Sequence, residues 1–341
     1  MRPSLSARSE TPGVRRNVRR ILITGGGGFI GFHLATALAV DAANEITLVD
    51  NFARGKMDRE LAALCERPKV RMLSLDLRDP ASYAQLGSTY DEVYHLAAML
   101  GVENVLQRPV DVLRVNALMT AQLLEWFIAD GGEKLLFSST SEAYAWTLQF
   151  HELPIPTPED VPLALTDLKN PRSTYAGSKI FGEMAVIHYC RSVGKPFAIA
   201  RYHNVYGPRM GNDHVIPQLY RRAADGQNPL VVYSADHVRA FCYVSDAVAT
   251  TIAAMRTPSA NGETFHVGND GEEITMDALA CRILAKAGID IKIDPQPAAN
   301  DPIRRRCPDV SKARRILNYR PSVTLDEGLE ITLPWYSRNK K

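Results

Sequence analysis

Tyr175 and Lys179 are the two residues of this sequence whose types and spacing most directly suggest catalysis. They stand four positions apart at the start of a helical pattern, so their side chains would share one face of a helix. A cation beside a phenol lowers the pKa of the phenol from its usual value of about 10. Such a tyrosine can remove a hydroxyl proton while hydride leaves the same carbon. The pair therefore predicts the oxidation of an alcohol, although this spacing also arises by chance in helices.

A glycine-rich turn predicts a binding site for a dinucleotide that would accept the hydride. Gly25, Gly28 and Gly31 lie between a short β-branched run and a helical pattern. Because glycine has no Cβ, a pyrophosphate can approach the amides at the start of this helix. Asp50 follows the second apolar run, where its carboxylate can accept hydrogen bonds from a ribose hydroxyl. The same carboxylate would repel a 2′-phosphate, so NAD is expected, while nearby Arg54 keeps NADP as an alternative.

Alternating strands and helices must position these residues. Short apolar runs recur at 70–77, 92–98, 134–140 and 197–207, and helical patterns lie between them. This alternation predicts an α/β fold with a doubly wound parallel sheet that helices cover on both faces. Ligand-binding residues of such a sheet are expected where the strands end.

The chain is expected to divide into a tail and two lobes. Residues 1–18 are predicted to form a disordered basic tail, and 19–206 the NAD-binding domain. Pro, Gly and Asp interrupt the patterns of 207–237 and 269–335, which we assign to a smaller, substrate-binding lobe. Two further segments are predicted to return to the first domain, namely 238–256 and about 263–268.

The composition of the 341 residues limits the classes of function. Hydrophobic residues make up 45% and charged residues 23%, which is typical of a globular protein and not of a disordered chain or a coiled coil. A net charge of +2 gives no field that would favour nucleic acid or an anionic membrane as a partner. No run approaches the roughly 20 consecutive apolar residues of a membrane helix, and the N-terminus lacks the apolar core of a signal peptide, so a cytoplasmic protein is expected. The 5 cysteines and 8 histidines show no ligand spacing, so no metal is expected.

The segment FSSTSEAY at 137–144 overlaps the end of the apolar run at 134–140, and it carries a second group of reactive side chains. With Tyr175 and Lys179, Thr140 resembles the Ser/Thr-Tyr-Lys triad of extended short-chain dehydrogenase/reductases in the NAD-dependent epimerase/dehydratase family of nucleotide-sugar enzymes. The resemblance extends over most of the chain and includes these features: HLAA at 95–98, Asn116, RYHNVYGPR at 201–209, Arg239 before FCYVSD, and RCPDVSKARRILNYRPSVTLDEGL near the end. It implies a Rossmann-type sheet with a smaller, discontinuous α/β substrate-binding lobe, NAD as cofactor and a nucleotide-sugar substrate.

The resemblance also implies roles for individual residues. Catalysis would be carried by Thr140, Glu142, Tyr175 and Lys179. Substrate would be bound by Ser141, Asn204, Arg239 and Arg306. Besides Tyr175 and Lys179, the NAD-contacting residues would be Gly25, Gly28, Phe29, Ile30, Gly31, Asp50, Asn51, Arg54, Asp76, Leu77, Leu96, Ala97 and Ala98. His203 stands where the family often has Phe, and we expect it to pack locally.

The residues after Thr140 favour one of the reactions that begin with oxidation of the sugar at C4. The triplet Thr140-Ser141-Glu142 resembles that of UDP-glucuronate decarboxylases, whereas typical 4,6-dehydratases have Thr-Asp-Glu. The segment 300–309 resembles the Arg-x-Pro-Asp sequence of the decarboxylases, in which the Arg meets the substrate carboxylate, and Arg306 is that residue. A guanidinium can hold a carboxylate through two parallel hydrogen bonds. We therefore expect a reaction like that of a UDP-glucuronate decarboxylase.

Other interpretations stay open. Arg304–Arg306 can be a solvated charge run. A UDP-sugar or UDP-uronate 4-epimerase is the next candidate, followed by a nucleotide-sugar 4,6-dehydratase, and an NAD-binding regulatory module is the candidate outside enzymes. The family pattern is broken at 143–146 and by a long following loop, both over the expected substrate. The resemblance further implies a homodimer formed by the apolar helices around 110–129 and 178–193.

Overall fold

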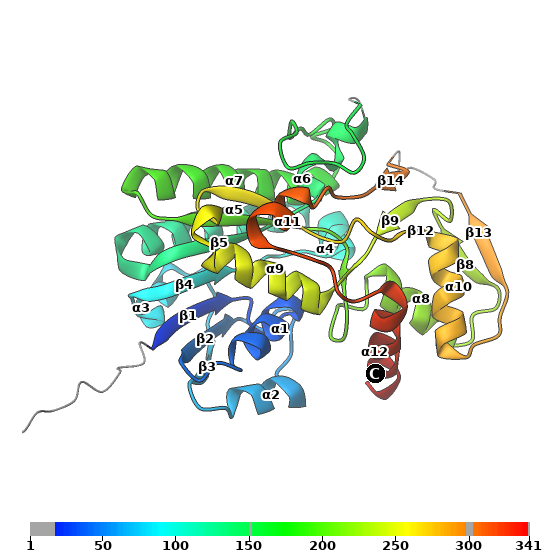
Figure 1. Cartoon of the computed structure of the whole chain (residues 1–341), viewed down its shortest axis with the longest axis horizontal. Coiled ribbons are helices and arrows are strands. Elements are labelled where there is room, and N and C mark those ends of the chain that lie inside the picture. Colours follow the sequence, from blue (N-terminus) through cyan, green and yellow to red (C-terminus); the bar gives the residue numbers. More distant parts are fainter. Residues whose placement is uncertain (1–17, 150–151, 298–302, 340–341) are drawn as a thin grey trace, which may run out of the picture.

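A parallel sheet forms the centre of the protein, as the computed structural model shows for residues 18–149, 152–297 and 303–339 (Figure 1). Within these residues, seven strands pair in the order β11-β6-β5-β4-β1-β2-β3, and every pairing is parallel. The strands are β1 (Arg19–Thr24), β2 (Asn44–Asp50), β3 (Val70–Ser74), β4 (Tyr90–His95), β5 (Gly132–Thr140), β6 (Phe197–Tyr202) and β11 (Glu263–Val267). The predicted tail, apart from Val18, lies outside the described residues.

The central strand β1 shows why the sheet needs cover on both faces. Ile21 and Ile23 belong to one buried apolar cluster, together with Leu34. Leu22 belongs to a second cluster, together with Leu123. Successive side chains of a strand point to opposite faces, so an unbroken apolar run must be buried on both sides.

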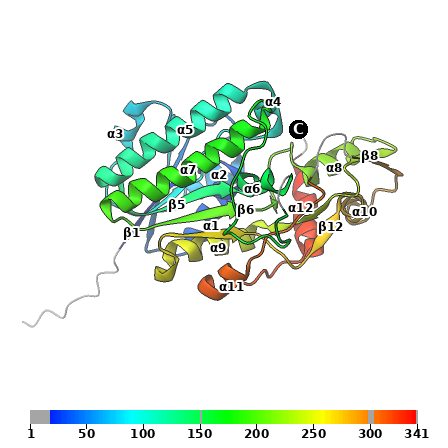
Figure 2. The ribbon, with the colours of Figure 1, turned by 90° about the horizontal axis from the view of Figure 1, so that it is seen from above.

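Helices supply this cover in two layers. The first cluster is covered by α1 (Phe29–Leu38), α2 (Arg59–Cys65), α9 (Val244–Arg256) and α11 (Ser311–Leu317). The second is covered by α3 (Tyr83–Leu86), α5 (Pro109–Trp126) and α7 (Arg172–Val193), and α4 (Val102–Gln107) packs on α5 and α7. Figure 2 shows α5 and α7 side by side, with α9 and α11 on the opposite side of the sheet. The expected doubly wound α/β fold is confirmed.

A smaller lobe lies beside the sheet (Figure 1). In it, β8 (Leu230–Tyr233) pairs with β13 (Ile293–Gln296), and β9 (Val238–Ala240) pairs with β12 (Glu273–Thr275) and β14 (Arg305–Arg306). Its helices are α8 (Val215–Ala224), α10 (Met276–Ala287) and α12 (Leu325–Arg338). The segment 238–256 divides between the lobes, since β9 belongs to the small sheet while α9 packs against α1.

The helical stretch Pro109–Gly131, which begins with α5, is the one stretch of the described residues that is long and apolar enough by composition to cross a membrane. Polar side chains such as Asp111 and Asn116 interrupt it, so it is not a run of consecutive apolar residues. It packs along α7, with Leu123 fully buried and Val110 74% exposed. Its apolarity thus reflects an inner face on the sheet and an outer face that is also partly apolar.

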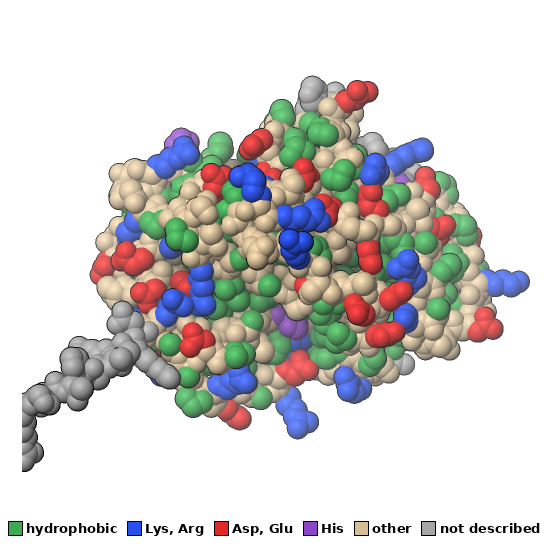
Figure 3. Space-filling model, in the orientation of Figure 1, with side chains coloured by type: hydrophobic (Ala, Val, Ile, Leu, Met, Phe, Trp, Pro, Cys, Tyr) green, Lys and Arg blue, Asp and Glu red, His purple; other side chains and the backbone are tan. Residues whose placement is uncertain are grey.

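On the molecular face shown in Figure 3, acidic and basic side chains are interspersed.

Candidate active site

A cleft of about 1220 Å³ contains nearly all of the predicted site residues. Its walls come from the glycine turn after β1, from the segments that follow β2 and β4, and from the end of β5. The segment after β3, the start of α7, the segment 204–215 and β14 also contribute, as do side chains of α5, α8 and α12. The site therefore lies at the carboxyl ends of the parallel strands, where ligands of open α/β sheets bind.

Thr140, Tyr175 and Lys179 are brought together by close packing of α7 on β5. Thr140 is the last residue of β5, and Tyr175 and Lys179 lie in the first two turns of α7. A Cβ added at Gly182 would stand 2.3 Å from the Phe137 ring, so only glycine lets this helix approach the strand so closely. The buried Nζ of Lys179 donates to the Ser138 carbonyl oxygen at 2.8 Å. This contact fixes the lysine head group against the end of β5.

Burial shifts the pKa values of Tyr175 and Lys179. Burial lowers the pKa of Lys179 to about 8, against the opposing charge of Glu183. The pKa of Tyr175 is raised to about 12, first by burial and then by the charge of Glu142, while a hydrogen bond with Thr140 and the charge of Arg54 lower it. The sequence argument expected a lowered phenol pKa. The structure gives the opposite direction because desolvation of the phenolate outweighs the hydrogen bond with Thr140 and the charge of Arg54.

Arg306 and Glu142 form an ion pair inside the cleft, with Nη1 and Oε1 2.5 Å apart. Burial favours the neutral acid, but the charge of Arg306 and its hydrogen bond outweigh burial, so the pKa of Glu142 is lowered. Arg306 is only 8% exposed, whereas Arg304 and Arg305 are exposed and Arg305 pairs with Glu273. The solvated charge run considered above therefore applies to Arg304 and Arg305 and not to Arg306.

The glycine turn fits the diphosphate of a dinucleotide. Gly25 has a φ of +71°, and a Cβ there would lie 2.8 Å from the Ala97 nitrogen. A Cβ on Gly31 would lie 2.2 Å from the Gly25 oxygen, so α1 begins directly against the turn. Gly28 is the N-cap of α1, and no side chain caps the helix there. The first amides of α1 are therefore available to an anion in the cleft.

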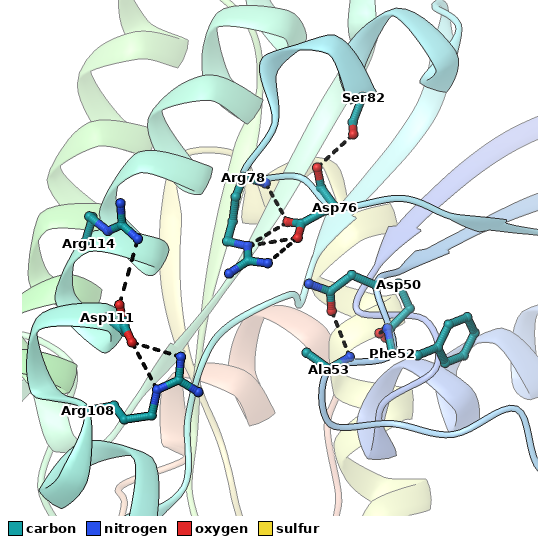
Figure 4. A network of polar contacts seen from close by, with 10 residues as sticks. Asp50, Phe52, Ala53, Asp76, Arg78, Ser82, Arg108, Asp111 and Arg114 are labelled. Atoms are coloured by element: carbon teal, nitrogen blue, oxygen red, sulfur yellow. Dashed lines mark hydrogen bonds and ion pairs between the residues drawn. The ribbon is translucent and has the colours of Figure 1, made fainter.

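The adenosine end of the proposed NAD site is lined by carboxylates that the sequence singled out. Asp50 accepts hydrogen bonds from the Gly27 amide at 3.0 Å and the Phe52 amide at 2.8 Å, which holds it at the end of β2. Asp76 is bound in bidentate fashion by Arg78, and this hydrogen bond is the main reason that its pKa is lowered to about 2. Figure 4 shows this pair facing the segment that carries Asp50. The other predicted NAD contacts also line the cleft: Phe29, Ile30, Asn51, Arg54, Leu77, Leu96, Ala97 and Ala98.

The sequence profile of the NAD-dependent epimerase/dehydratase family matches residues 21–268. This chain belongs to that family. The match covers nearly all of the predicted first domain, including the glycine turn, Asp50 and the Tyr175–Lys179 pair. The chain is therefore an NAD-dependent enzyme, and the regulatory module considered above is set aside.

Curated relatives and solved structures place the chain within this family. It is 33% identical to UDP-N-acetyl-alpha-D-glucosaminuronate decarboxylase of Bacillus cytotoxicus, over 93% of this chain and 98% of that protein. It is 32% identical to UDP-glucuronic acid decarboxylase 6 of Arabidopsis thaliana, over 92% of this chain and 87% of that one. The fold resembles UDP-glucuronic acid 4-epimerase from Bacillus cereus, with a TM-score of 0.81, 26% identity, and 94% and 99% of the two chains covered. It also resembles UDP-glucose 4-epimerase from Thermotoga maritima, with a TM-score of 0.80, 27% identity, and 94% and 100% covered.

The remaining substrate-binding candidates of this family member lie at the border of the two lobes. Ser141 and Asn204 line the cleft, and the Asn204 side chain donates to the Ala240 carbonyl at 2.9 Å. Arg239 lies outside the set of described residues that line the cleft. Its guanidinium donates to the carbonyls of Val238 and Ile303 at 2.9 and 3.0 Å. It thus ties β9 to the residues just before β14, and its role in substrate binding stays a prediction.

The sequence argument missed the segment that supports Arg306. Thr157, in the long loop after Trp146, accepts from the Asp309 amide at 2.8 Å and donates its own amide to the Cys307 carbonyl at 2.9 Å. The carboxylate of Glu159 accepts from the His266 amide at 2.9 Å. These contacts fasten the loop beside the residues that follow β14 and beside β11. The sequence of this long loop has no pattern that predicts these hydrogen bonds, because the residues that they join are far apart in the sequence.

His203 lies in a buried cluster with Tyr144 and His266. The Tyr144 hydroxyl and His203 Nε2 are 3.2 Å apart, and the two imidazole rings meet edge to face at 4.6 Å between centroids. Burial lowers the pKa of His203 well below its usual value and that of His266 to about 3. Both imidazoles are therefore neutral packing elements behind the cleft. In the residues that the structure describes, no group of three or more His, Cys, Asp and Glu side chains could hold a metal ion.

Proposed function

We propose that this enzyme decarboxylates a UDP-linked hexuronate, in the manner expected from a UDP-glucuronate decarboxylase. The observation that carries the proposal is the placement of buried Arg306 in the same cleft as Thr140 and Tyr175, paired with Glu142. A guanidinium has five N–H donors, so Arg306 can hold Glu142 and a substrate carboxylate together. A neutral hexose would offer this guanidinium no matching anion.

The curated relatives support the same reaction. Those named above are a decarboxylase of UDP-N-acetyl-alpha-D-glucosaminuronate and one of UDP-glucuronic acid, and each matches most of this chain. Both names describe loss of a carboxyl group from a UDP-linked uronic acid. We therefore include both uronates as candidate substrates, since the described contacts favour a carboxylate without distinguishing the group at C2.

In the proposed reaction, Tyr175 takes the proton of the C4 hydroxyl while Thr140 holds the phenol by a hydrogen bond, and Lys179 supplies positive charge from the same face of α7. Burial raises the pKa of the phenol, and the positive charge of bound NAD would lower it. NAD, when bound, supplies the acceptor of the C4 hydride and returns that hydride at the end. The 4-keto sugar is a β-keto acid, so its carboxylate leaves as carbon dioxide and the electron pair moves toward the ketone. C5 then takes up a proton, C4 is reduced, and Tyr175 returns its proton to the C4 oxygen. Overall, C5 loses its carboxylate as carbon dioxide and gains one proton, and NAD is regenerated.

Epimerisation of a UDP-uronate at C4 is the second candidate. The UDP-glucuronic acid 4-epimerase from Bacillus cereus, solved with UDP-glucuronic acid and NAD, shares the fold over 94% of this chain. This reaction would use the same carboxylate-binding cation. It differs in that the 4-keto sugar keeps its carboxylate and is reduced on its other face.

An NMR time course distinguishes the two. Purified protein is supplied with NAD and with either UDP-glucuronate or UDP-N-acetylglucosaminuronate, and the anomeric and C5 proton signals are followed. We expect a pentose spin system with release of carbon dioxide from at least one substrate. A hexuronate with inverted C4 would show the epimerase instead, and two unchanged uronates would overturn the proposal.

We also propose that the protein acts as a homodimer in the cytoplasm, as the sequence led us to expect. The outer face of α4, α5 and α7 carries exposed apolar side chains, which are Val102, Leu106, Val110, Leu113, Leu118, Phe181 and Met184. α5 and α7 pack together, so these residues form one surface that a second copy could cover. The cytoplasmic location rests on the sequence argument.

A further inference from the structure

Arg54 lines the cleft and links the segment after β2 to the segment before α8 in the small lobe. It lies in the segment between β2 and α2, four residues after Asp50. Its Nη2 is 3.6 Å from a carboxylate oxygen of Asp213 and 3.5 Å from Nε2 of His214. Asp213 and His214 lie directly before α8, more than 150 residues further along the chain. The guanidinium therefore connects two segments that both line the cleft.

Glycines make room for this contact. A Cβ on Gly211 would lie 2.5 Å from Nη2 of Arg54, so any larger residue there would displace the guanidinium. A Cβ on Gly101, in the segment after β4, would lie 4.0 Å from the same atom and 3.3 Å from Asp213. Three chain segments thus form a slot around one side chain. On the other side, Gly55 lies against the glycine turn, since a Cβ there would be 2.9 Å from the Gly27 oxygen.

A second connection joins the same two segments. Arg209 pairs with Asp58 and, at 3.3 Å, with Glu60, and its guanidinium lies 4.0 Å from the centre of the Phe32 ring. Its side chain is 6% exposed, whereas those of Arg54 and Asp213 are 40% and 49% exposed. The Arg209 side chain therefore holds the two segments together at a buried point. The contact between Arg54 and Asp213 is weak and solvated, so it can open and close.

We propose that Arg54 and the segment 209–214 form a strap that closes over bound NAD and slows its dissociation. The inference rests on the proposed placement of the dinucleotide in this cleft, which Arg54, parts of the segment 209–214 and the glycine turn before α1 all line. The strap suits a reaction that must reduce its own 4-keto intermediate. NADH that left early would strand the oxidised sugar, so a slow exit keeps the two half-reactions coupled.

The test compares Arg54→Ala with Arg282→Ala. Arg282 is a matched control because its contact with Asp326 in the small lobe has the same 3.6 Å length, and the two side chains are 46% and 52% exposed. Protein loaded with NAD is mixed with a large excess of a fluorescent NAD analogue, and the dissociation rate is read directly. We expect Arg54→Ala to release NAD roughly two to five times faster, the range that an exposed ion pair supports. Arg282→Ala should release it at the native rate.

Asp213→Asn separates the strap from a direct contact between Arg54 and the diphosphate. If the strap acts, Asp213→Asn also speeds release, and the Arg54→Ala/Asp213→Asn double variant is no faster than either single variant. If Arg54 only binds phosphate, Asp213→Asn leaves release unchanged or slows it, and the strap is wrong. Because the rate is measured without a sugar substrate, the outcome is independent of whether the decarboxylase proposal holds. Thermal unfolding of each variant confirms that the fold is kept.

Discussion

Arg306 holds the carboxylate of Glu142 at 2.5 Å across 164 residues of sequence, inside the cleft that also contains Tyr175. The pair keeps Glu142 ionised, since the charge of Arg306 overcomes the effect of burial on its pKa. In the proposed reaction, it also places a cation where the substrate carboxylate would bind.

Arg306→Ala should reduce kcat/KM for the uronate substrate by about 30-fold or more, since truncating one partner of a desolvated charge pair between protein and ligand costs about 2–5 kcal/mol. Initial rates of carbon dioxide release provide the measurement. Arg305→Ala is the matched control, because Arg305 is the preceding residue of β14 and pairs with Glu273 at the surface. Equal activity of the two variants would show that Arg306 does not bind the substrate carboxylate.

Tyr175→Phe should lower kcat by about 10²- to 10⁴-fold, because the phenol is the proposed acid and base at C4. The absorbance of reduced cofactor after addition of substrate and the appearance of product are followed together. Tyr90→Phe removes another buried hydroxyl, which donates to the Leu86 carbonyl at the opposite end of the strands, and should keep activity. Normal turnover by Tyr175→Phe would contradict the proposed chemistry.

The ion pair also makes an acid-dependent contribution to stability. The pKa of Glu142 is lower in the folded protein than its ordinary value of 4.5, so the contribution is present above pH 4.5 and is lost as pH falls through the folded pKa. Urea unfolding of the native protein and of Glu142→Gln should therefore differ at pH 7 and converge as the pH falls below 4. A difference that does not change with pH would show that Glu142 acts through packing alone.

Gly182→Ala should destabilise the protein by about 1–3 kcal/mol, the usual cost of forcing an extra carbon into a packed interior. The new Cβ would meet the Phe137 ring at 2.3 Å and push α7, with Tyr175 and Lys179, away from β5. Gly177→Ala, in the same helix, meets only the tip of the Leu165 side chain at 3.2 Å and serves as the control. In thermal unfolding, the Tm of Gly182→Ala should be lower than that of the native protein, and the Tm of Gly177→Ala should be close to the native value or higher.

Met184→Arg should convert the proposed dimer into a monomer. Met184 is 53% exposed on α7 within the apolar surface formed with α4 and α5, and a charge there would be buried by a second copy. Sedimentation or light scattering gives the molecular mass. Ile331→Arg changes an equally exposed residue of α12, 52% exposed, and should leave the mass unchanged. A native protein that is already monomeric would end the dimer proposal.

Local patterns were sufficient for the fold and for part of the site. The apolar run of β1, the glycine turn and the helical pattern of α1 are short-range features, because each depends on the backbone and side chains of neighbouring residues. For the same reason, the four-residue spacing of Tyr175 and Lys179 placed both in the first turns of one helix. The ends of parallel strands meet at one edge, so the grouping of Asp50, Asp76 and Thr140 also followed from the predicted topology.

By itself, then, the sequence determined the sheet, the cofactor turn and the types of reactive side chain, all of which follow from short-range periodicity and from chain direction in a parallel sheet. Tertiary structure alone decided that Arg306 is buried while Arg305 is solvated, that Thr157 pairs beside β14, and that Arg54 reaches Asp213. It also reversed the expected direction of the Tyr175 pKa, since desolvation depends on every residue packed around the phenol. These outcomes depend on contacts between remote segments, and such contacts leave no period or spacing in the sequence from which they can be read.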